Sequence, residues 1–216
     1  MKRLSISLVA LGCLLNGGCD PATIGADTVD TAAFLRVEAG HLWNFGYDIG
    51  ETWPEADSLQ LFLRSGDADG EDDEAPGVPF GFSAGVEDQE PEDVLGARFE
   101  VDADGAVLLT EVFDFEGAVS IFDPPPVFGP SSWEVGDTVS SDTQLDGSSI
   151  TFQVTLADRG EHEVYYGMFP DVAHLVVDDG GATALGGDWW LAADVGPVRL
   201  QTVDYTLPEA ELVTYR

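Results

Sequence analysis

The sequence has very little basic charge. Eight Lys and Arg residues stand against 41 Asp and Glu, which gives a formal net charge of −33. Nucleic-acid binding needs clustered Lys or Arg to neutralise phosphates, so that class of partner is excluded. Repulsion from anionic lipid headgroups follows from the same charge. We interpret the acidity as a source of solubility; binding of divalent cations is the alternative.

Cysteine is scarce as well, and no apolar run is long enough to span a membrane. The two cysteines are Cys13 and Cys19, and the longest apolar run is 4–15. That run has about 12 residues, whereas a membrane-spanning helix needs roughly 20. Because both cysteines lie near the amino terminus, the rest of the chain has no disulfide and its stability must come from its core.

The amino terminus has the three-part layout of an exported protein. Met1–Arg3 is positive, 4–15 is apolar, and small residues precede Cys19. This layout predicts a removable signal over 1–18. The junction 15–19 resembles the lipobox of bacterial lipoproteins, which implies that Cys19 carries diacylglyceryl and palmitate chains. Two alternatives stay open: lipidation at Cys13, or ordinary cleavage without lipid.

Lipidation at Cys19 predicts where the protein resides. Two or more acyl chains give stable attachment to a bilayer. We therefore expect an exported protein of the bacterial cell envelope, anchored to the inner or the outer membrane. Residues 19–33 are polar and turn-prone at their start, which predicts a flexible tether. Residues 34–216 then form a single domain.

Strand patterns dominate the predicted domain. Apolar and polar residues alternate in Ile150–Leu156, Leu59–Leu63 and Val203–Leu207. Alternation of this kind places one face of a strand on a core and the other in water. The fold class is therefore all-β: an antiparallel curled sheet, either a half-barrel or a sandwich.

Turns and exceptions complete this organisation. Asp104-Gly105 between two apolar arms predicts a hairpin over Arg98–Leu109, and Asp178–Gly181 predicts a second turn. Thr31–Glu38 is the one segment expected to form a short helix. Residues 66–93 are rich in Asp, Glu and Pro, so we expect a long solvated acidic loop there.

Three short motifs resemble those of a family of bacterial β-rich lipoproteins. Val37–Trp43 is similar to its "vGntW" opening, and Trp189–Val198 is similar to its "yWlapgVGlV" strand pair. Pro124–Pro126 with Trp133–Asp137 resembles its central "PP…vGd" element. The resemblance implies an antiparallel sheet curled into an open half-barrel, similar to the periplasmic lipoprotein carriers. It implies no catalytic residues, and the acidic segment departs from it.

One pentapeptide matches a catalytic motif. Gly81–Gly85 fits G-x-S-x-G, the nucleophile elbow of α/β-hydrolases, with Ser83 as the nucleophile. The elbow needs a strained turn from a strand into a helix, and no helical pattern follows residue 85. A secreted serine hydrolase that uses Ser83 is therefore an alternative to the preferred function.

Metal binding has one set of candidate ligands. Asp67, Asp69 and Asp72 lie in an acidic run that resembles a calcium loop, but the glycine and glutamate positions of an EF-hand do not match. We therefore expect no cofactor and no specific metal site, with Ca²⁺ binding at these residues as the alternative; a calcium-dependent adhesion or structural module is a further alternative function. His41, His162 and His174 lack the spacing of a zinc site.

Large aromatic residues could line a binding surface. Trp189 and Trp190 are adjacent, and neighbours on a strand face opposite sides, so one of them must face outward. They are the candidate ligand-binding residues. With no supported catalytic constellation, we expect a non-enzymatic, membrane-anchored envelope lipoprotein that binds a partner or an apolar ligand on its β-sheet.

Overall fold

The computed structural model describes residues 28–47, 59–65, 77–86, 92–113, 118–202 and 210–215. These residues contain one helix, α1 (Thr31–Leu35), and fifteen strands. The strands are β1 (Thr28–Val29), β2 (Leu42–Tyr47), β3 (Leu59–Ser65), β4 (Val78–Val86), β5 (Glu92–Val101), β6 (Val107–Phe113), β7 (Val119–Asp123), β8 (Val127–Gly129), β9 (Trp133–Glu134), β10 (Thr138–Leu145), β11 (Ser148–Val164), β12 (Gly167–Asp178), β13 (Gly187–Ala192), β14 (Gly196–Thr202) and β15 (Ala210–Tyr215).

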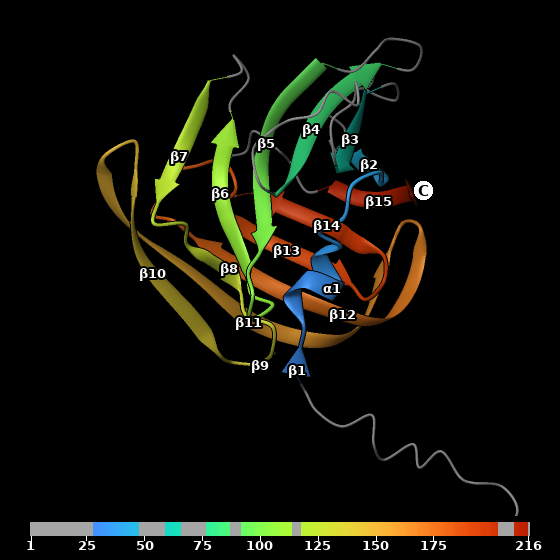
Figure 1. Cartoon of the computed structure of the whole chain (residues 1–216). Helices are drawn as coiled ribbons and strands as arrows, with labels where there is room; N and C mark the ends of the chain where they lie inside the picture. The colour runs from blue at the N-terminus through green and yellow to red at the C-terminus, as the bar shows by residue number, and fades with distance from the viewer. Residues whose placement is uncertain are drawn as a thin grey trace, which may run out of the picture.

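Thirteen of the strands form one antiparallel sheet that curls back on itself. Its order is β5-β4-β3-β2-β15-β14-β13-β12-β11-β10-β7-β6-β8, and β5 also pairs with β6. Only two residue pairs join β7 to β10, so the sheet is not an evenly closed barrel. In Figure 1, β3 to β7 form one layer and β10 to β14 cross behind it. The predicted all-β class with a curled antiparallel sheet is confirmed.

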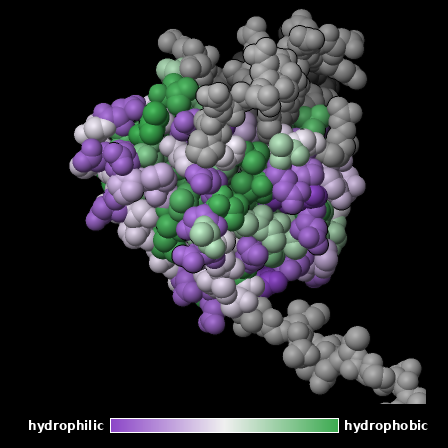
Figure 2. All heavy atoms as spheres, viewed as in Figure 1, coloured by the Kyte–Doolittle hydropathy of each residue, from purple (hydrophilic) through white to green (hydrophobic). Residues whose placement is uncertain are grey.

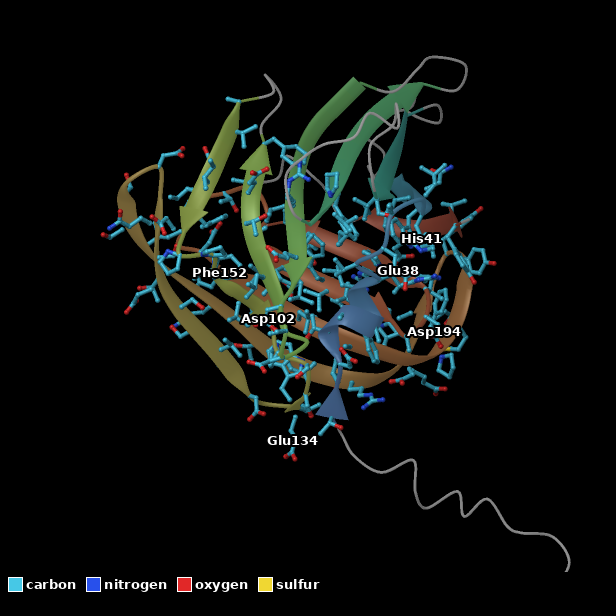
Figure 3. The ribbon with its side chains drawn as sticks, in the orientation of Figure 1. Glu38, His41, Asp102, Glu134, Phe152 and Asp194 are labelled. Carbon is cyan, nitrogen blue, oxygen red and sulfur yellow. The ribbon has the colours of Figure 1, made fainter. Side chains whose placement is uncertain are left out.

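The core fills the space between the two layers. Alternate residues of each strand point inward, as in β11, where Phe152, Val154 and Leu156 are fully buried. Figure 3 shows Phe152 pointing between the layers. Rings meet edge to face across the interior, for example Phe99 with Phe128 at 5.0 Å between centroids. Figure 2 shows a hydrophobic band across the front face between β8 and α1, and hydrophilic residues over β10.

The predicted hairpins have the expected turn chemistry. At Asp104-Gly105 the chain turns between β5 and β6, and the Asp102 carboxylate accepts hydrogen bonds from the amides of Asp104 and Ala106. Between β12 and β13 the buried Asp179 carboxylate accepts from the amides of Gly181 and Thr183. Both segments are turns, as the sequence predicted.

The predicted end of the tether and the predicted end of the short helix are both wrong. Residues 28–33 were expected in the tether, but Val29 is buried and β1 pairs with β9. The Arg159 guanidinium donates to the Thr28 carbonyl oxygen at 2.5 Å and forms a two-bond ion pair with Asp171, which fixes this segment to the domain. The short helix is where it was expected, although it ends at Leu35.

The predicted acidic loop also contains a strand. Val78–Val86 form β4, which pairs with both β3 and β5. Apolar residues alternate along this stretch, but Pro79 and the acidic neighbours masked the pattern. Pro79 is tolerated because the pairing of β4 with β3 extends only from Phe80 onward, so its missing amide interrupts no bond there. The predicted strand at Val203–Leu207 lies outside the described residues.

Two of the motifs that carry the family resemblance meet in space. Trp43 is buried on β2, and its indole Nε1 donates to the Val195 carbonyl oxygen at 2.7 Å. Gly196 follows with a φ of +98°, and a Cβ placed there would lie 2.7 Å from the Trp43 ring. Figure 3 shows Glu38, His41 and Asp194 on this side of the molecule. The motifs therefore form a structural contact between β2 and β14.

A substitution at Gly196 tests this contact. Gly196→Ala should lower the free energy of unfolding by about 3 kcal/mol, because a left-handed backbone costs 1–2 kcal/mol without glycine and the Trp43 ring must shift. Gly160 on β11 provides the control, since its backbone is outside the left-handed region and a Cβ there meets open space. Urea unfolding measures both. Equal stability of the two variants would contradict the packing described.

Candidate functional site: a stacked row and a tyrosine cluster

The two adjacent tryptophans face opposite sides of the sheet. Trp189 is buried in the core, and its Nε1 donates to the Leu185 carbonyl oxygen at 3.0 Å. Trp190 is half-buried on the outer face. The expectation that one of the pair faces outward is confirmed, and Trp190 is the residue that does so.

Trp190 belongs to a row of side chains that crosses four strands. His174 on β12, Trp190 on β13, Arg199 on β14 and Glu211 on β15 are direct cross-strand partners in that order. The His174 ring stacks on Trp190 at 4.4 Å between centroids, and the Arg199 guanidinium lies 4.5 Å from the Trp190 ring centroid. These neighbours come from opposite sides, so the indole is packed between an imidazole and a guanidinium. We call these four residues the stacked row.

The two nitrogen-bearing side chains of the row that flank Trp190 each lie beside a carboxylate. His174 Nε2 lies 2.6 Å from Asp188 Oδ1, and Arg199 Nη1 lies 4.0 Å from Glu211 Oε1. All four of these charged or titratable side chains are partly exposed. The row thus gathers two cationic or titratable groups on a strongly acidic molecule and pairs each with a carboxylate.

The β11–β12 hairpin bends over the end of this row. Register shifts between Leu156 and Asp158 and between Gly160 and His162 interrupt the pairing of β11 with β12. Such bulges bend a strand and increase its twist. Figure 1 shows the resulting curl beside the carboxyl end of β15.

Backbone hydrogen bonds fix the turn of the hairpin on β15. The Tyr165 amide donates to Glu211 Oε2 at 3.0 Å, and the Tyr166 amide donates to the Leu212 carbonyl oxygen at 2.9 Å. The Tyr166 ring stacks on Phe169 at 5.9 Å and meets Tyr215 at 5.5 Å. The turn is therefore docked on a neighbouring strand of the sheet.

Four large side chains at this turn are exposed. We call them the tyrosine cluster, and their exposed fractions are as follows: Tyr165 78%, Tyr166 49%, Met168 56% and Tyr215 40%. Exposed apolar residues that stand alone need no explanation, but Tyr166 and Tyr215 meet ring to ring, and exposed residues that lie together mark an interaction site. Val164 and Phe169 on either side of the turn are buried, and the Tyr166 ring stacks on Phe169.

The turn that carries the cluster differs in backbone geometry from the β10–β11 turn. Val164 pairs with Gly167, so Tyr165 and Tyr166 form a two-residue loop, and neither has a positive φ. The β10–β11 hairpin instead uses Asp146 and Gly147 at φ of 50° and 82°, which suits a two-residue loop. Because neither turn position has a positive φ, tyrosine fits both without backbone strain.

His162 connects the hairpin to the stacked row. Its ring stacks over Trp190 at 5.8 Å between centroids, and its Nε2 lies 3.4 Å from Arg199 Nη1. Partial burial, followed by the adjacent Arg199 charge, lowers the pKa of His162 below its usual value. Glu211 acts in the opposite direction and His174 lowers the pKa further.

The other predicted site residues lie elsewhere. Ser83 is inside β4, paired with Phe62 on one side and Asp93 on the other, so Gly81–Gly85 is not a strand-to-helix turn. Cys19, Asp67, Asp69 and Asp72 lie outside the described residues. Within the described ranges, no group of three or more His, Cys, Asp or Glu side chains is arranged to hold a metal ion.

Two shallow clefts lie on the outer surface beside β11, away from the tyrosine cluster. Each has a volume of about 440 Å³, and they share Ser149, Ile150 and Thr151. Side chains there bond one another across the strands, as Thr151 Oγ1 does with Asp142 Oδ1 at 3.0 Å. The clefts are polar and open, which does not suit an apolar ligand.

The tyrosine cluster and two members of the stacked row, Arg199 and Glu211, were not predicted. A Tyr-Tyr-Gly sequence between two period-two segments was the available signal, since it places two aromatic residues at a hairpin turn. The docking of that turn on β15 depends on bulges, and no motif marks it.

A scan of protein-family models gives no match to this chain, and searches of curated proteins and of solved structures also return none. Fold and site thus define a mostly β-sheet protein with one large antiparallel sheet. Among the described residues, no helix has the length and apolar character needed to cross a membrane.

Substitutions of the two adjacent tryptophans distinguish a core position from a position on the outer face of the sheet. Trp189→Ala should cost about 3–5 kcal/mol of unfolding free energy, because it empties a packed core position. Trp190→Ala should cost only about 1 kcal/mol, since that side chain is half-buried on the surface. Urea denaturation of both variants checks the difference. Similar losses in the two would show that the outer row is as important to stability as the core.

Proposed function

We propose that this protein is a cell-envelope lipoprotein without catalytic activity that binds a protein partner through the tyrosine cluster. The observation that carries the proposal is the exposure of Tyr165 and Tyr166 at a turn that is docked rather than free. Tyrosine supplies a large contact area at low cost in conformational entropy, and it is enriched at binding hot spots. A turn that is already docked loses little further conformational entropy when a partner binds.

The surroundings of the cluster indicate the chemistry of the partner. Glu161 and Glu163 are exposed on the same hairpin, and Glu211 is partly exposed beside the turn. A partner surface with an apolar pocket and a rim of Lys or Arg complements this arrangement. A second copy of the chain does not, because each copy has a net charge of −33.

The position of the cluster supports a partner rather than the anchoring membrane. In Figure 1 the described chain begins with β1 at the bottom of the view, whereas the hairpin turn lies beside the end of β15. A domain tethered through Cys19 would therefore present the cluster away from its point of attachment. The side chains packed between the layers favour a partner on the surface over an apolar ligand inside the sheet.

Photo-crosslinking in the source bacterium tests this function. A benzophenone amino acid at position 165 should capture one specific protein, and the same residue at position 121 should not. Ile121 is a matched control because it is also exposed, at 56%, but lies on β7. The captured protein, once purified, must bind the unmodified chain. Equal capture from both positions, or capture without binding by the purified protein, counts against the proposal.

A further inference from the structure

One histidine joins the docked hairpin to the outer face of the sheet. Among the groups that hold the turn, His162 reaches back to the body of the sheet, where it stacks on Trp190 and contacts Arg199. A guanidinium only donates hydrogen bonds, so Nε2 of His162 must accept the bond from Arg199 Nη1. The docked geometry therefore requires a neutral imidazole with its lone pair on Nε2.

The strands around His162 supply both signs of charge. The groups that face it are as follows: His174 from β12, Arg199 from β14 and Glu211 from β15, while β13 contributes Trp190 and the Asp188 that is bonded to His174. On its own strand, Glu161 and Glu163 point to the opposite face. The Arg199 nitrogen Nη1 lies 3.4 Å from His162 Nε2.

We propose that proton uptake by His162 releases the hairpin turn from β15, so that the tyrosine cluster is presented differently in acid and at neutral pH. The proposal concerns the regulation of the binding surface described above and rests on that function. The interaction that changes is the one between the His162 imidazole and the Arg199 guanidinium.

Release of the hairpin turn follows from proton binding at His162 Nε2. When Nε2 binds a proton, it can no longer accept from Arg199 Nη1, and two cations then face each other. Glu211 pairs with Arg199 and acts on the charge of His162, and it also accepts a hydrogen bond from the Tyr165 amide. Attraction of Glu211 toward the imidazolium competes with that bond and loosens the turn. An imidazolium gains attraction from the Trp190 face, but the Arg199 guanidinium already lies over that ring.

The direction of the pH effect follows from the lowered pKa of His162. Burial first, and then Arg199, make proton binding harder in the docked state than in a released hairpin. Docking is therefore fully favoured above the usual value of about 6.5. It is lost as the pH falls through the lowered pKa, because the released form binds the proton more readily.

Hydrogen exchange of the Tyr166 amide measures docking directly, since this amide donates to Leu212. NMR on the purified protein without any partner should show protection at pH 7.5 that falls as the pH is lowered to 5.0, after correction for intrinsic exchange. His162→Gln cannot titrate and should show the same protection at both pH values. His174→Gln is the matched control and should keep the pH response of the native chain.

Three results overturn the proposal: no pH response in the native chain, a response that persists in His162→Gln, or one that disappears in His174→Gln alone. If His162→Gln fails to fold, the native chain still decides the question. The Tyr166 amide shift must then follow the same midpoint as the His162 ring signals, and different midpoints refute the mechanism. Because no partner is present, failure here is distinct from failure of the photo-crosslinking experiment.

Discussion

Replacing both Tyr165 and Tyr166 by serine is expected to weaken binding of the crosslinked partner by at least about a hundredfold. Each buried tyrosine hot spot contributes about 2 kcal/mol or more, and every 1.4 kcal/mol changes the dissociation constant tenfold. Serine keeps the backbone amides that bond Glu211 and Leu212, so the turn itself is expected to stay docked. Isothermal titration calorimetry with the purified partner measures the change.

The matched control replaces two side chains of similar exposed fraction on another surface. Val119 and Ile121 on β7 are 52% and 56% exposed, similar to the two tyrosines. Serine at both positions should leave the dissociation constant within about twofold, because they lie outside the proposed interface. If the two double variants lose affinity equally, general surface hydrophobicity rather than the tyrosine cluster drives binding.

Changing Cys19 to alanine is expected to abolish lipid attachment. The thiol is the group expected to receive the diacylglyceryl chains, and two or more chains are what give stable attachment to a bilayer. Cells fed labelled palmitate should label the native protein and not the variant. Fractionation should move the variant from the membrane pellet to the soluble fraction or leave it as an uncleaved precursor.

Cys13 provides the control for this experiment, because it is the competing lipidation site. Cys13→Ala should label as strongly as the native chain. Labelling that survives in Cys19→Ala but disappears in Cys13→Ala would move the anchor to residue 13. Absence of label in the native protein would contradict lipidation altogether.

Much of the sheet could be predicted because its strands carry their own pattern. In Ile150–Leu156 every second residue is apolar, and the structure buries Phe152, Val154 and Leu156 in the core. Asp104-Gly105 encodes its hairpin turn just as locally. Each of these features depends on residues that are close in sequence, so no knowledge of the tertiary structure was needed.

The errors arise where tertiary contacts override local signals. β4 was mistaken for part of a loop because Pro79 and nearby acidic residues outweighed its alternation, although Pro79 lies beyond the part of β4 that pairs with β3 and its missing amide interrupts no bond there. The first residues of the domain looked like a tether. Arg159, 131 residues away from Thr28, holds them in place.

The candidate site was harder to predict, since it combines four separate segments. Alternation alone indicated that Trp189 or Trp190 faces outward. It could not show that His174, Arg199 and Glu211 flank Trp190, because that requires the register of β12 to β15. Nor could it show that two bulges bring Tyr165 onto β15. Strand order and bulges are properties of the whole sheet.

A hydrogen-exchange footprint of the partner complex tests the binding surface most directly. Exchange should slow in residues 161–170 and 210–215 when the partner binds, and it should stay unchanged in β10 and the first half of β11. Slowed exchange in β10 and β11 with an unchanged hairpin would contradict the account, because the partner would then bind the polar outer face instead of the tyrosine cluster.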